Sequence, residues 1–208
     1  MKLLLLVFAL FGATYAQFSA TAQADILKVH NDLRSQVALG TFEAQGQTLP
    51  GASDMQQMQW YDELAQSAQA FANTCPDEPS GSEEYGESSY YAWSEKKPTN
   101  LNVYGKKAAL SWKNEFENFD FYNHFDENAK ESGPGDNFQM IWSRSYLIGC
   151  GVKNCGPDRN TFTQAYKIIV ICHYYEKGNN LDENVYEEGE SCSNCLGYVC
   201  DQDSGLCQ

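Results

Sequence analysis

The stretch FQMIWSRSYLIGCGV, residues 138–152, decides the fold of this chain. It is rich in aromatic and β-branched residues, and it predicts strands over residues 137–144 and 147–154. A third strand is predicted over residues 164–175, QAYKIIVICHYY. In this interpretation Trp142 and Cys150 are core residues of a sheet.

Three amphipathic segments precede these strands, at residues 21–40, 58–75 and 105–122, and each predicts a helix. The apolar stripe of the first is Ile26, Val29, Leu33 and Val37. That of the second is Trp60, Leu64, Ala68 and Phe71. The polar residues 76–100 between the second and third helix predict a loop. Helices that lead and strands that follow indicate an α+β fold with helices packed on a sheet.

The two ends of the chain differ from its middle. Residues 1–16, MKLLLLVFALFGATYA, place one lysine before a short apolar run with a small residue at its end, which is typical of a secretory signal peptide. We therefore expect a secreted, extracellular protein without membrane insertion. The predicted divisions are a signal peptide at 1–16, a main domain at 17–180 and a cysteine-rich tail at 181–208.

The chain is strongly acidic, with 14 basic and 28 acidic residues and a formal net charge of −14. Such a charge predicts repulsion of nucleic acid and of anionic membranes. It is equally consistent with simple solubility, and it selects no partner by itself.

Eight cysteines in an exported chain predict four disulfides. Four of them lie in the terminal run CSNCLGYVCDQDSGLC, residues 192–207, which is too short and too polar to fold around a core of its own. Crosslinks must hold it. Sequence alone leaves the pairing open, because eight cysteines allow about 105 connectivities.

Six separated motifs then agree with one another. They are HNDLR (30–34), MQWYDELAQSAQAFANTC (58–75), YGE (85–87), WKNE (112–115), QMIWSRSYLIGCGV (139–152) and VICHYYEKGN (170–179). In this order they resemble the CAP or SCP superfamily of cysteine-rich secretory, antigen 5 and pathogenesis-related proteins. The terminal cysteine cluster looks most like the hinge-type extension of nematode SCP-like and venom-allergen-like members.

The resemblance implies a three-layer α-β-α sandwich around an antiparallel sheet. It also implies four disulfides. They are Cys75–Cys150, Cys155–Cys172, Cys192–Cys200 and Cys195–Cys207.

The resemblance further implies a central cleft in which two histidines and two glutamates can bind zinc. Glu87 of the GE motif and Glu115 of the WxxE motif match the two acids. Neither histidine is present: residues 76–87 contain none, and Asp136 occupies the position expected for the other. The framework motifs are kept while the cleft chemistry differs.

The chain's three histidines offer little replacement. His30 lies in a helix motif and His173 in a strand motif, and both are expected to be structural. His124, in a loop after the third helix, is the only candidate for a displaced ligand. Because the thiols are expected to be oxidised, a zinc site is not predicted. The carboxylates of Glu87, Glu115 and Asp136 leave Ca²⁺ or Mg²⁺ as the alternative.

A catalytic role is not expected, because Ser80 and Ser82 lie in the cleft loop without an imidazole to activate them. A carboxylate pair acting as a weak hydrolase is the enzymatic alternative. The resemblance favours a protein that binds a sterol, a fatty acid or an extracellular protein, as in immune or host modulation. Residues 90–104, rich in aromatics, are expected outside regular structure, and Tyr90, Tyr91 and Trp93 are the candidate ligand contacts.

Overall fold

The computed structural model describes residues 18–119, 122–131 and 135–208, except for the side chain of Asp136. The predicted signal peptide lies outside these residues. Among the helices that the structure describes, none is long and apolar enough to cross a membrane.

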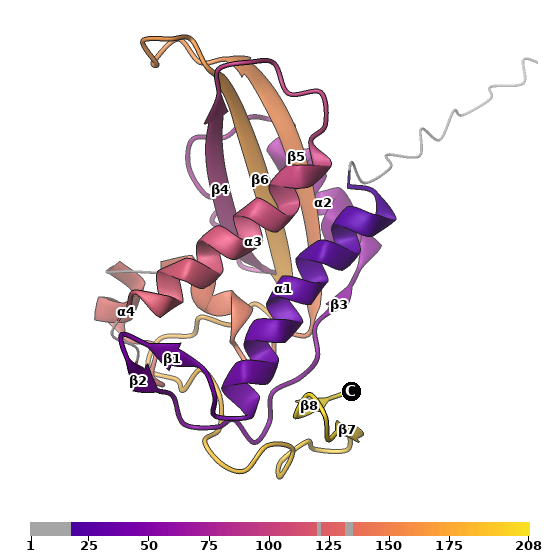
Figure 1. Ribbon diagram of the computed structural model, residues 1–208, viewed down its shortest axis with the longest axis vertical. Coiled ribbons are helices and arrows are strands. Elements are labelled where there is room, and N and C mark those ends of the chain that lie inside the picture. Colours follow the sequence, from indigo (N-terminus) through magenta and orange to yellow (C-terminus); the bar gives the residue numbers. More distant parts are fainter. Residues whose placement is uncertain (1–17, 120–121, 132–134) are drawn as a thin grey trace, which may run out of the picture.

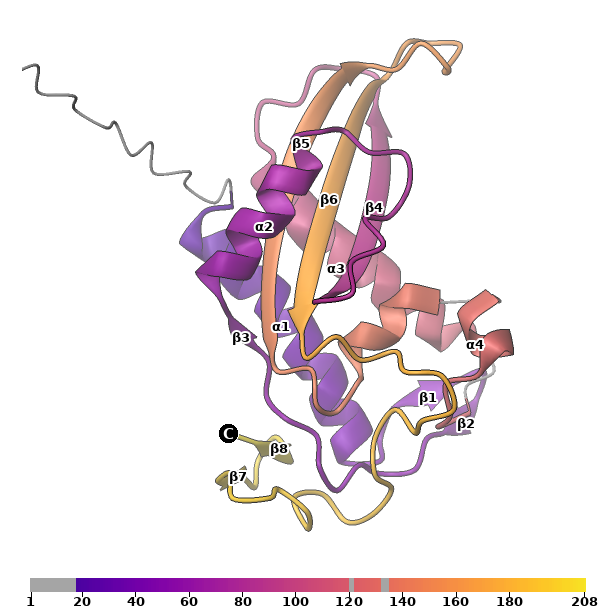
Figure 2. The same ribbon diagram turned by 180° about the vertical axis from the view of Figure 1, so that it is seen from behind.

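Three long strands form the centre of the molecule: β4 (Gly86–Ser94), β5 (Leu147–Pro157) and β6 (Tyr166–Tyr175). β6 lies between the other two and pairs antiparallel with both, and the short β3 (Gln59–Trp60) adds a parallel pair along β5. α1 (Ala20–Ala38) and α3 (Asn102–Glu117) cover one face of this sheet, and α2 (Asp62–Ala72) covers the other (Figures 1 and 2). The expected α+β sandwich is therefore present, with a mixed sheet.

Small elements complete the chain. They are β1 (Glu43–Ala44), β2 (Gln47–Thr48), α4 (Glu127–Glu131), the 3₁₀ helix η1 (Gly135–Met140), β7 (Cys200–Asp201) and β8 (Leu206–Cys207).

The predicted stripe of α1 is confirmed. Ile26, Leu33 and Val37 are fully buried and Val29 nearly so, in the core between the helical layer and the sheet. The same helix carries Arg34 into the interior, where its guanidinium donates to the carbonyls of Gln56, Met140, Trp142 and Ser143 at 2.7–3.1 Å. The Trp142 and Ser143 carbonyls also accept backbone amides, each at 3.1 Å, so Arg34 adds to the hydrogen bonds of a buried turn.

Those contacts explain one wrong prediction. Residues 137–144, expected as a strand, form the end of η1 and a turn. Their carbonyls are directed to Arg34 rather than to a neighbouring strand, so the backbone is satisfied without a ladder. Trp142 remains a core residue as expected, with 1% of its surface exposed.

The glycines of the GCGV motif set the distance between α2 and the sheet. A β-carbon on Gly149 would lie 2.0 Å from the amide nitrogen of Ala65, and one on Gly151 would lie 2.4 Å from the Cα of Gln69. Only glycine allows this approach. α2 consequently buries its small side chains, whereas Leu64 and Phe71 of the predicted stripe stay partly exposed.

The disulfides correct two of the four implied pairs. Cys75 pairs with Cys155 and Cys150 with Cys172, whereas Cys192–Cys200 and Cys195–Cys207 are as implied. Cys150 and Cys172 are register partners on adjacent strands, with Cα atoms 4.1 Å apart, and both face the main core. Cys155 faces the α2 side, where Cys75 follows the end of that helix. Alternation along β5 therefore sends the two cysteines to different layers.

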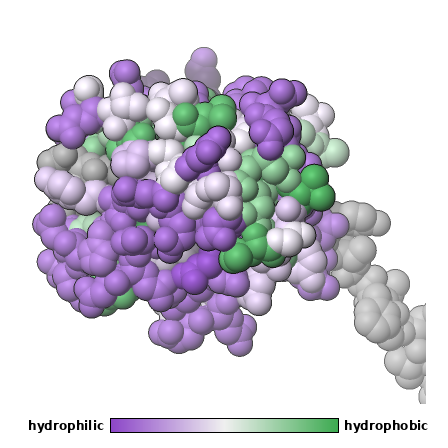
Figure 3. All heavy atoms as spheres, turned by 90° about the horizontal axis from the view of Figure 1, so that it is seen from below, coloured by the Kyte–Doolittle hydropathy of each residue, from purple (hydrophilic) through white to green (hydrophobic). Residues whose placement is uncertain are grey.

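The tail is fastened to the main body as well as to itself. Leu206 is buried, Cys207 donates its amide to the carbonyl of Met55, and its own carbonyl accepts from Gln57. Seen from this end of the molecule, apolar residues gather toward one side of a mostly hydrophilic face (Figure 3).

Candidate functional site

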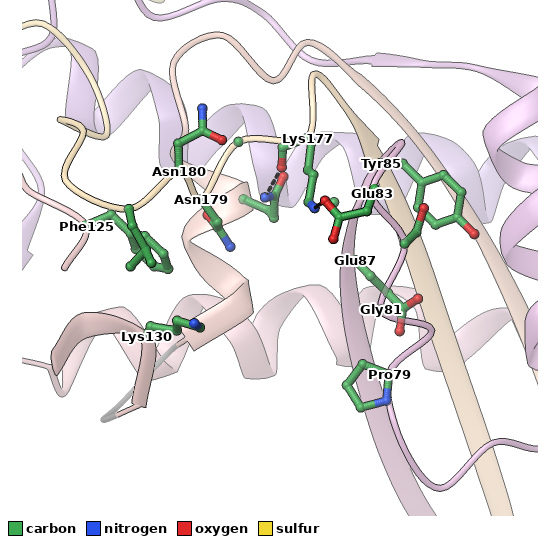
Figure 4. A pocket seen from close by; sticks show the side chains of 15 residues that line it. Pro79, Gly81, Glu83, Tyr85, Glu87, Phe125, Lys130, Lys177, Asn179 and Asn180 are labelled. Carbon is green, nitrogen blue, oxygen red and sulfur yellow. Dashed lines mark hydrogen bonds and ion pairs between the residues drawn. The ribbon is translucent and has the colours of Figure 1, made fainter. Parts of the chain in front are cut away.

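A cavity of about 560 Å³ lies at the end of the sheet where β4 begins and β6 ends. Its walls come from four segments: the loop of residues 79–87, the turn of residues 177–181 after β6, the α4 region and η1. Figure 4 shows Lys130 and Lys177 entering it from different sides, with Phe125 at one end and Glu87 at the other. The lining mixes charged, amide and apolar groups.

Gln139 links two of these walls. Its side-chain amide donates to the carbonyl of Lys177, and Ser145 in turn donates to the carbonyl of Glu176 at 2.7 Å. Gly86 makes room for this link, because a β-carbon there would lie 2.4 Å from the Gln139 side chain. The turn after β6 is thereby held against η1.

Glu87 anchors the opposite wall. Its two carboxylate oxygens each accept from the amide of Ser80 at 3.3 Å, and Oε1 also accepts from the Ser89 hydroxyl at 3.1 Å. Burial by itself would raise the pKa of Glu87, but the attraction of the nearby His173 imidazole and the hydrogen bonds from Ser80 outweigh it and lower that pKa. Glu87 is therefore ionised, and its carboxylate holds the loop of residues 79–87 through the Ser80 amide.

His173 lies beneath Glu87, where the sequence indicated only a structural histidine. The two residues are register partners, and Nε2 of His173 is 3.4 Å from Oε2 of Glu87, within ion-pair range but without hydrogen-bond geometry. Nδ1 contacts the Ser67 hydroxyl at 3.1 Å, and the Tyr85 ring stacks on the imidazole at 3.9 Å between centroids. Because Tyr85 and the carboxylate enclose this buried ring, it positions Glu87 rather than facing the cavity.

Glu115 does not join Glu87. It lies on α3, accepts from the Asn137 amide at 2.6 Å, and lines a separate cavity with Asn118 and Phe119. Burial raises the pKa of Glu115, and the bond from Asn137 offsets part of that effect. The backbone of Asp136 lies in η1, and its side chain is outside the described part of the structure.

The other two histidines are placed away from both acids. His30 is buried, with Nδ1–H donating to the Ile26 carbonyl at 2.9 Å and Nε2 accepting from the Tyr174 hydroxyl at 3.1 Å. Its structural role is as expected. His124 is exposed and contacts Asn184 at 3.4 Å.

These positions do not form the donor set that a family-type zinc site requires. Within the described residues, no three His, Cys, Asp or Glu side chains converge on one point. Glu87 and Glu115 also turn to different hydrogen-bond partners in different cavities. For the same reason they do not face each other as a carboxylate pair across one ligand.

The candidate ligand contacts do not form one surface. Residues 86–94 are strand β4 and α3 begins at Asn102, so the expectation of an irregular segment over 90–104 is confirmed only for residues 95–101 and is wrong at both ends. Alternation places Tyr90 with the main core and Tyr91 with the α2 layer. Trp93 is half-exposed at the far end of β4, with its indole N–H donating to Asp158 at 2.8 Å.

Several cavity residues escaped the sequence analysis, among them Lys130, Lys177 and Gln139. Lys130 lies in no recognised motif, and its segment meets the others only after folding. Gln139 and Lys177 lie within the recognised motifs QMIW and EKGN, which was the available signal for both.

The fold and the motifs agree with the comparison to known families. The model of the CAP family, described as the cysteine-rich secretory protein family, matches residues 27–174. The chain therefore belongs to the CAP family.

Its relatives include secretory and venom proteins. Cysteine-rich secretory protein 2 of Cavia porcellus is 30% identical over 198 residues, covering 89% of this chain and 68% of that protein. The cysteine-rich venom protein of Tityus serrulatus is 32% identical over 173 residues, covering 82% of this chain but only 41% of that protein. Four disulfides in a chain with such relatives fit an oxidising, extracellular compartment.

Solved structures give the same assignment. BmVAL-1 superposes with a TM-score of 0.81 at 30% identity, covering 91% of this chain and 95% of the other. NaASP2, solved with Zn²⁺, gives 0.80 at 27% identity, covering 92% and 97%.

Proposed function

We propose that this chain is a secreted binding protein, not an enzyme, and that its cavity holds a small amphipathic anion of the fatty-acid type. The observation that carries the proposal is the pair of ammonium groups, Lys130 and Lys177, at a cavity that also presents Phe125 and Leu181. A carboxylate would meet the lysines, and the start of an alkyl chain would cover the apolar side.

Both lysines are available for such a ligand. Lys177 pairs with Glu83 at 3.0 Å, but the Glu83 side chain is 93% exposed. Lys130 approaches Glu127 at 3.5 Å, and both side chains are more than half exposed. Because exposed ion pairs contribute little, a ligand carboxylate could replace the side-chain partners at low cost.

Catalysis has weaker support. Ser67, His173 and Glu87 lie in a row, but stacking by Tyr85 and burial keep the imidazole away from the cavity. Ser82 lines the cavity, and its hydroxyl accepts from the amide of Glu84 at 3.1 Å. A serine nucleophile requires a base within reach of its hydroxyl, and no described imidazole lines this cavity.

Calorimetric titration with a C12 fatty acid tests the cavity. We expect Lys177→Gln and Lys130→Gln each to weaken binding roughly tenfold, because each removes a charge-assisted hydrogen bond. Lys28→Gln, an exposed lysine on α1 paired with Asp32, is the matched control and should bind normally. Equal affinity for the C12 alcohol, or unchanged binding by both cavity variants, would refute the proposal.

A protein partner is the second candidate, favoured by the tail. Its stapled loop exposes Leu196 by 83%, Val199 by 74% and Tyr198 by 48%. Two disulfides fix this loop, so little conformational entropy would be lost when it docks. In a complex with such a partner, residues 196–199 should be protected from deuterium exchange. Protection only at other residues would exclude the tail as the docking surface.

A further inference from the structure

The positive charge of this acidic chain is concentrated at the end of the sheet opposite the cavity. Segments 95–107 and 153–167 contain seven of the 14 Lys and Arg residues, but only two acids, Glu95 and Asp158. The two segments meet where β4 and β5 end and β6 begins, because Ser94 and Pro157 both pair with Tyr166. We call this end of the molecule the basic tip.

Most of these seven charges lack an acidic partner among the residues that the structure describes. Lys167 pairs with Asp77, and Lys106 lies 3.8 Å from Asp25. Among the described residues, no ion pair involves the other five, which are Lys96, Lys97, Lys107, Lys153 and Arg159. Asp158, the acid nearest the hairpin turn, is occupied by the Trp93 indole.

The basic tip contains a groove. A cavity of about 570 Å³ is lined by Lys97 and Lys153 together with Leu101 and Tyr166. Two ammonium groups at one concave surface suit a phosphate-bearing headgroup, which can accept hydrogen bonds from both.

An exposed apolar side chain lies at the same end of the sheet as the groove, in the hairpin turn. Phe162 lies in the turn between β5 and β6 and is fully exposed, at 105% of the reference surface. This turn projects beyond the helices at the top of the molecule (Figures 1 and 2). An isolated exposed phenylalanine is unremarkable by itself. Together with the lysines of the basic tip, it gives this end of the molecule the composition of an interfacial membrane anchor.

We propose that the basic tip docks on the surface of a membrane containing anionic phospholipid. Phosphate groups contact Lys96, Lys97 and Lys153, and the ring of Phe162 enters the boundary between headgroups and acyl chains. This contact lies on the surface and does not span the bilayer.

The net negative charge of the chain does not prevent this contact. Glu87 of the cavity is in register with Gly149 through β6, eight residues along β5 from Pro157. At about 3.3 Å per residue this separation is roughly 26 Å, several times the Debye length of about 8 Å at physiological salt. Nearer the tip, Asp25 and Asp77 pair with Lys106 and Lys167. Counted with Glu95 and Asp158, they leave seven basic against four acidic residues, so the basic tip keeps a net positive charge (7 − 4 = +3).

Vesicle sedimentation tests the proposal with the purified, oxidised protein. We expect the protein to bind vesicles that contain about 30% phosphatidylserine and not to bind vesicles of pure phosphatidylcholine. Binding should weaken strongly as the salt concentration rises from about 0.05 to about 0.5 M, because salt screens surface charges. The double variant Lys96→Gln/Lys97→Gln should weaken binding about 25-fold, and Phe162→Ser about tenfold.

Matched controls are available in the same chain. Lys28→Gln removes an exposed lysine from α1, and Leu196→Ser removes an exposed apolar residue from the tail. Both should bind like the unaltered protein, and melting curves of all variants should coincide because every altered side chain is exposed. Lys177→Gln should also keep vesicle binding, which separates this proposal from that for the cavity.

Three results would overturn the proposal. They are absence of binding to anionic vesicles at low salt, equal binding by the tip variants and the controls, and complete displacement by millimolar inorganic phosphate. The last result would indicate a free phosphate site. Retention on a sulfated polysaccharide without vesicle binding would likewise replace the membrane with a glycan.

Discussion

At the scale of single residues, the molecule holds its titratable groups in unequal environments. Burial lowers the pKa of His30 to about 4, with the nearby Arg34 charge acting in the same direction and the Ile26 carbonyl opposing it. Arg34 is also buried, and desolvation lowers its pKa to about 9, partly offset by Asp54. Arg34 is nevertheless charged at neutral pH, whereas His30 is neutral.

His30 predicts an acid-sensitive fold. In the unfolded chain its pKa is near 6.5, so as pH falls from 6.5 toward 4 the unfolded state binds a proton that the folded state excludes. Stability should therefore fall by up to about 3 kcal/mol across this window. Urea unfolding at pH 7, 6 and 5 measures the slope.

His30→Gln should flatten that slope, whereas His124→Gln, an exposed position, should retain it. An unchanged slope in His30→Gln would contradict the assignment of this pH window to His30.

Glu87 affects stability at lower pH. Because its pKa is lowered in the folded state, it contributes stability above the ordinary pKa of a glutamate, and this contribution is lost as pH falls through the folded-state pKa.

At the scale of elements, α2 approaches β5 most closely at Gly149 and Gly151, and the side chain of Gln69 on α2 forms hydrogen bonds to the strand. The Gln69 amide donates to the carbonyl of Val152 and accepts from its N–H, both at 3.0 Å. β3 pairs with β5 only at Leu147 and Ile148. Farther along β5, the Gln69 side chain therefore bonds to backbone groups at the edge of the strand that β3 does not reach.

Gly151→Ala should destabilise the protein by roughly 2–3 kcal/mol, because the new methyl group meets the helix backbone and α2 must shift. Gly81→Ala is the matched control. Its φ is +66° and its β-carbon would meet nothing within 4 Å, so it should cost only about 1 kcal/mol of backbone strain. Equal losses in chemical denaturation would show that α2 is not held at this glycine.

At the scale of the whole molecule, the tail is part of the folded unit. Cys207 bonds to the backbone at Met55 and Gln57, and Ser35 of α1 donates to the carbonyl of Ser204 at 2.7 Å. The far end of this tail loop, around Leu196, is exposed.

Leu206→Ala should therefore lower stability by about 2–4 kcal/mol through loss of a buried side chain. Leu196→Ala, at 83% exposure in the same tail, should change it by less than about 0.5 kcal/mol. Thermal melting of the two variants distinguishes a docked tail from a freely hanging one, for which both changes would be equally small.

What the sequence by itself determined is the pattern that local spacing carries: the apolar stripe of α1 and the strands β5 and β6. Its separated motifs also indicated the family, and the resemblance to that family implied the two tail disulfides. The strand misassigned at 137–144 and the loop misassigned at 86–94 failed because their backbone partners lie far away in sequence, at Arg34 and on β6.

Only the tertiary structure decided which groups meet. It paired Cys75 with Cys155, separated Glu87 from Glu115, placed His173 under Glu87, and brought Lys130 to the same cavity as Lys177. It also gathered dispersed lysines into one basic tip on an acidic chain. The physical reason is that side-chain chemistry depends on distances across layers and strands, and these are set by packing between segments that no local pattern connects.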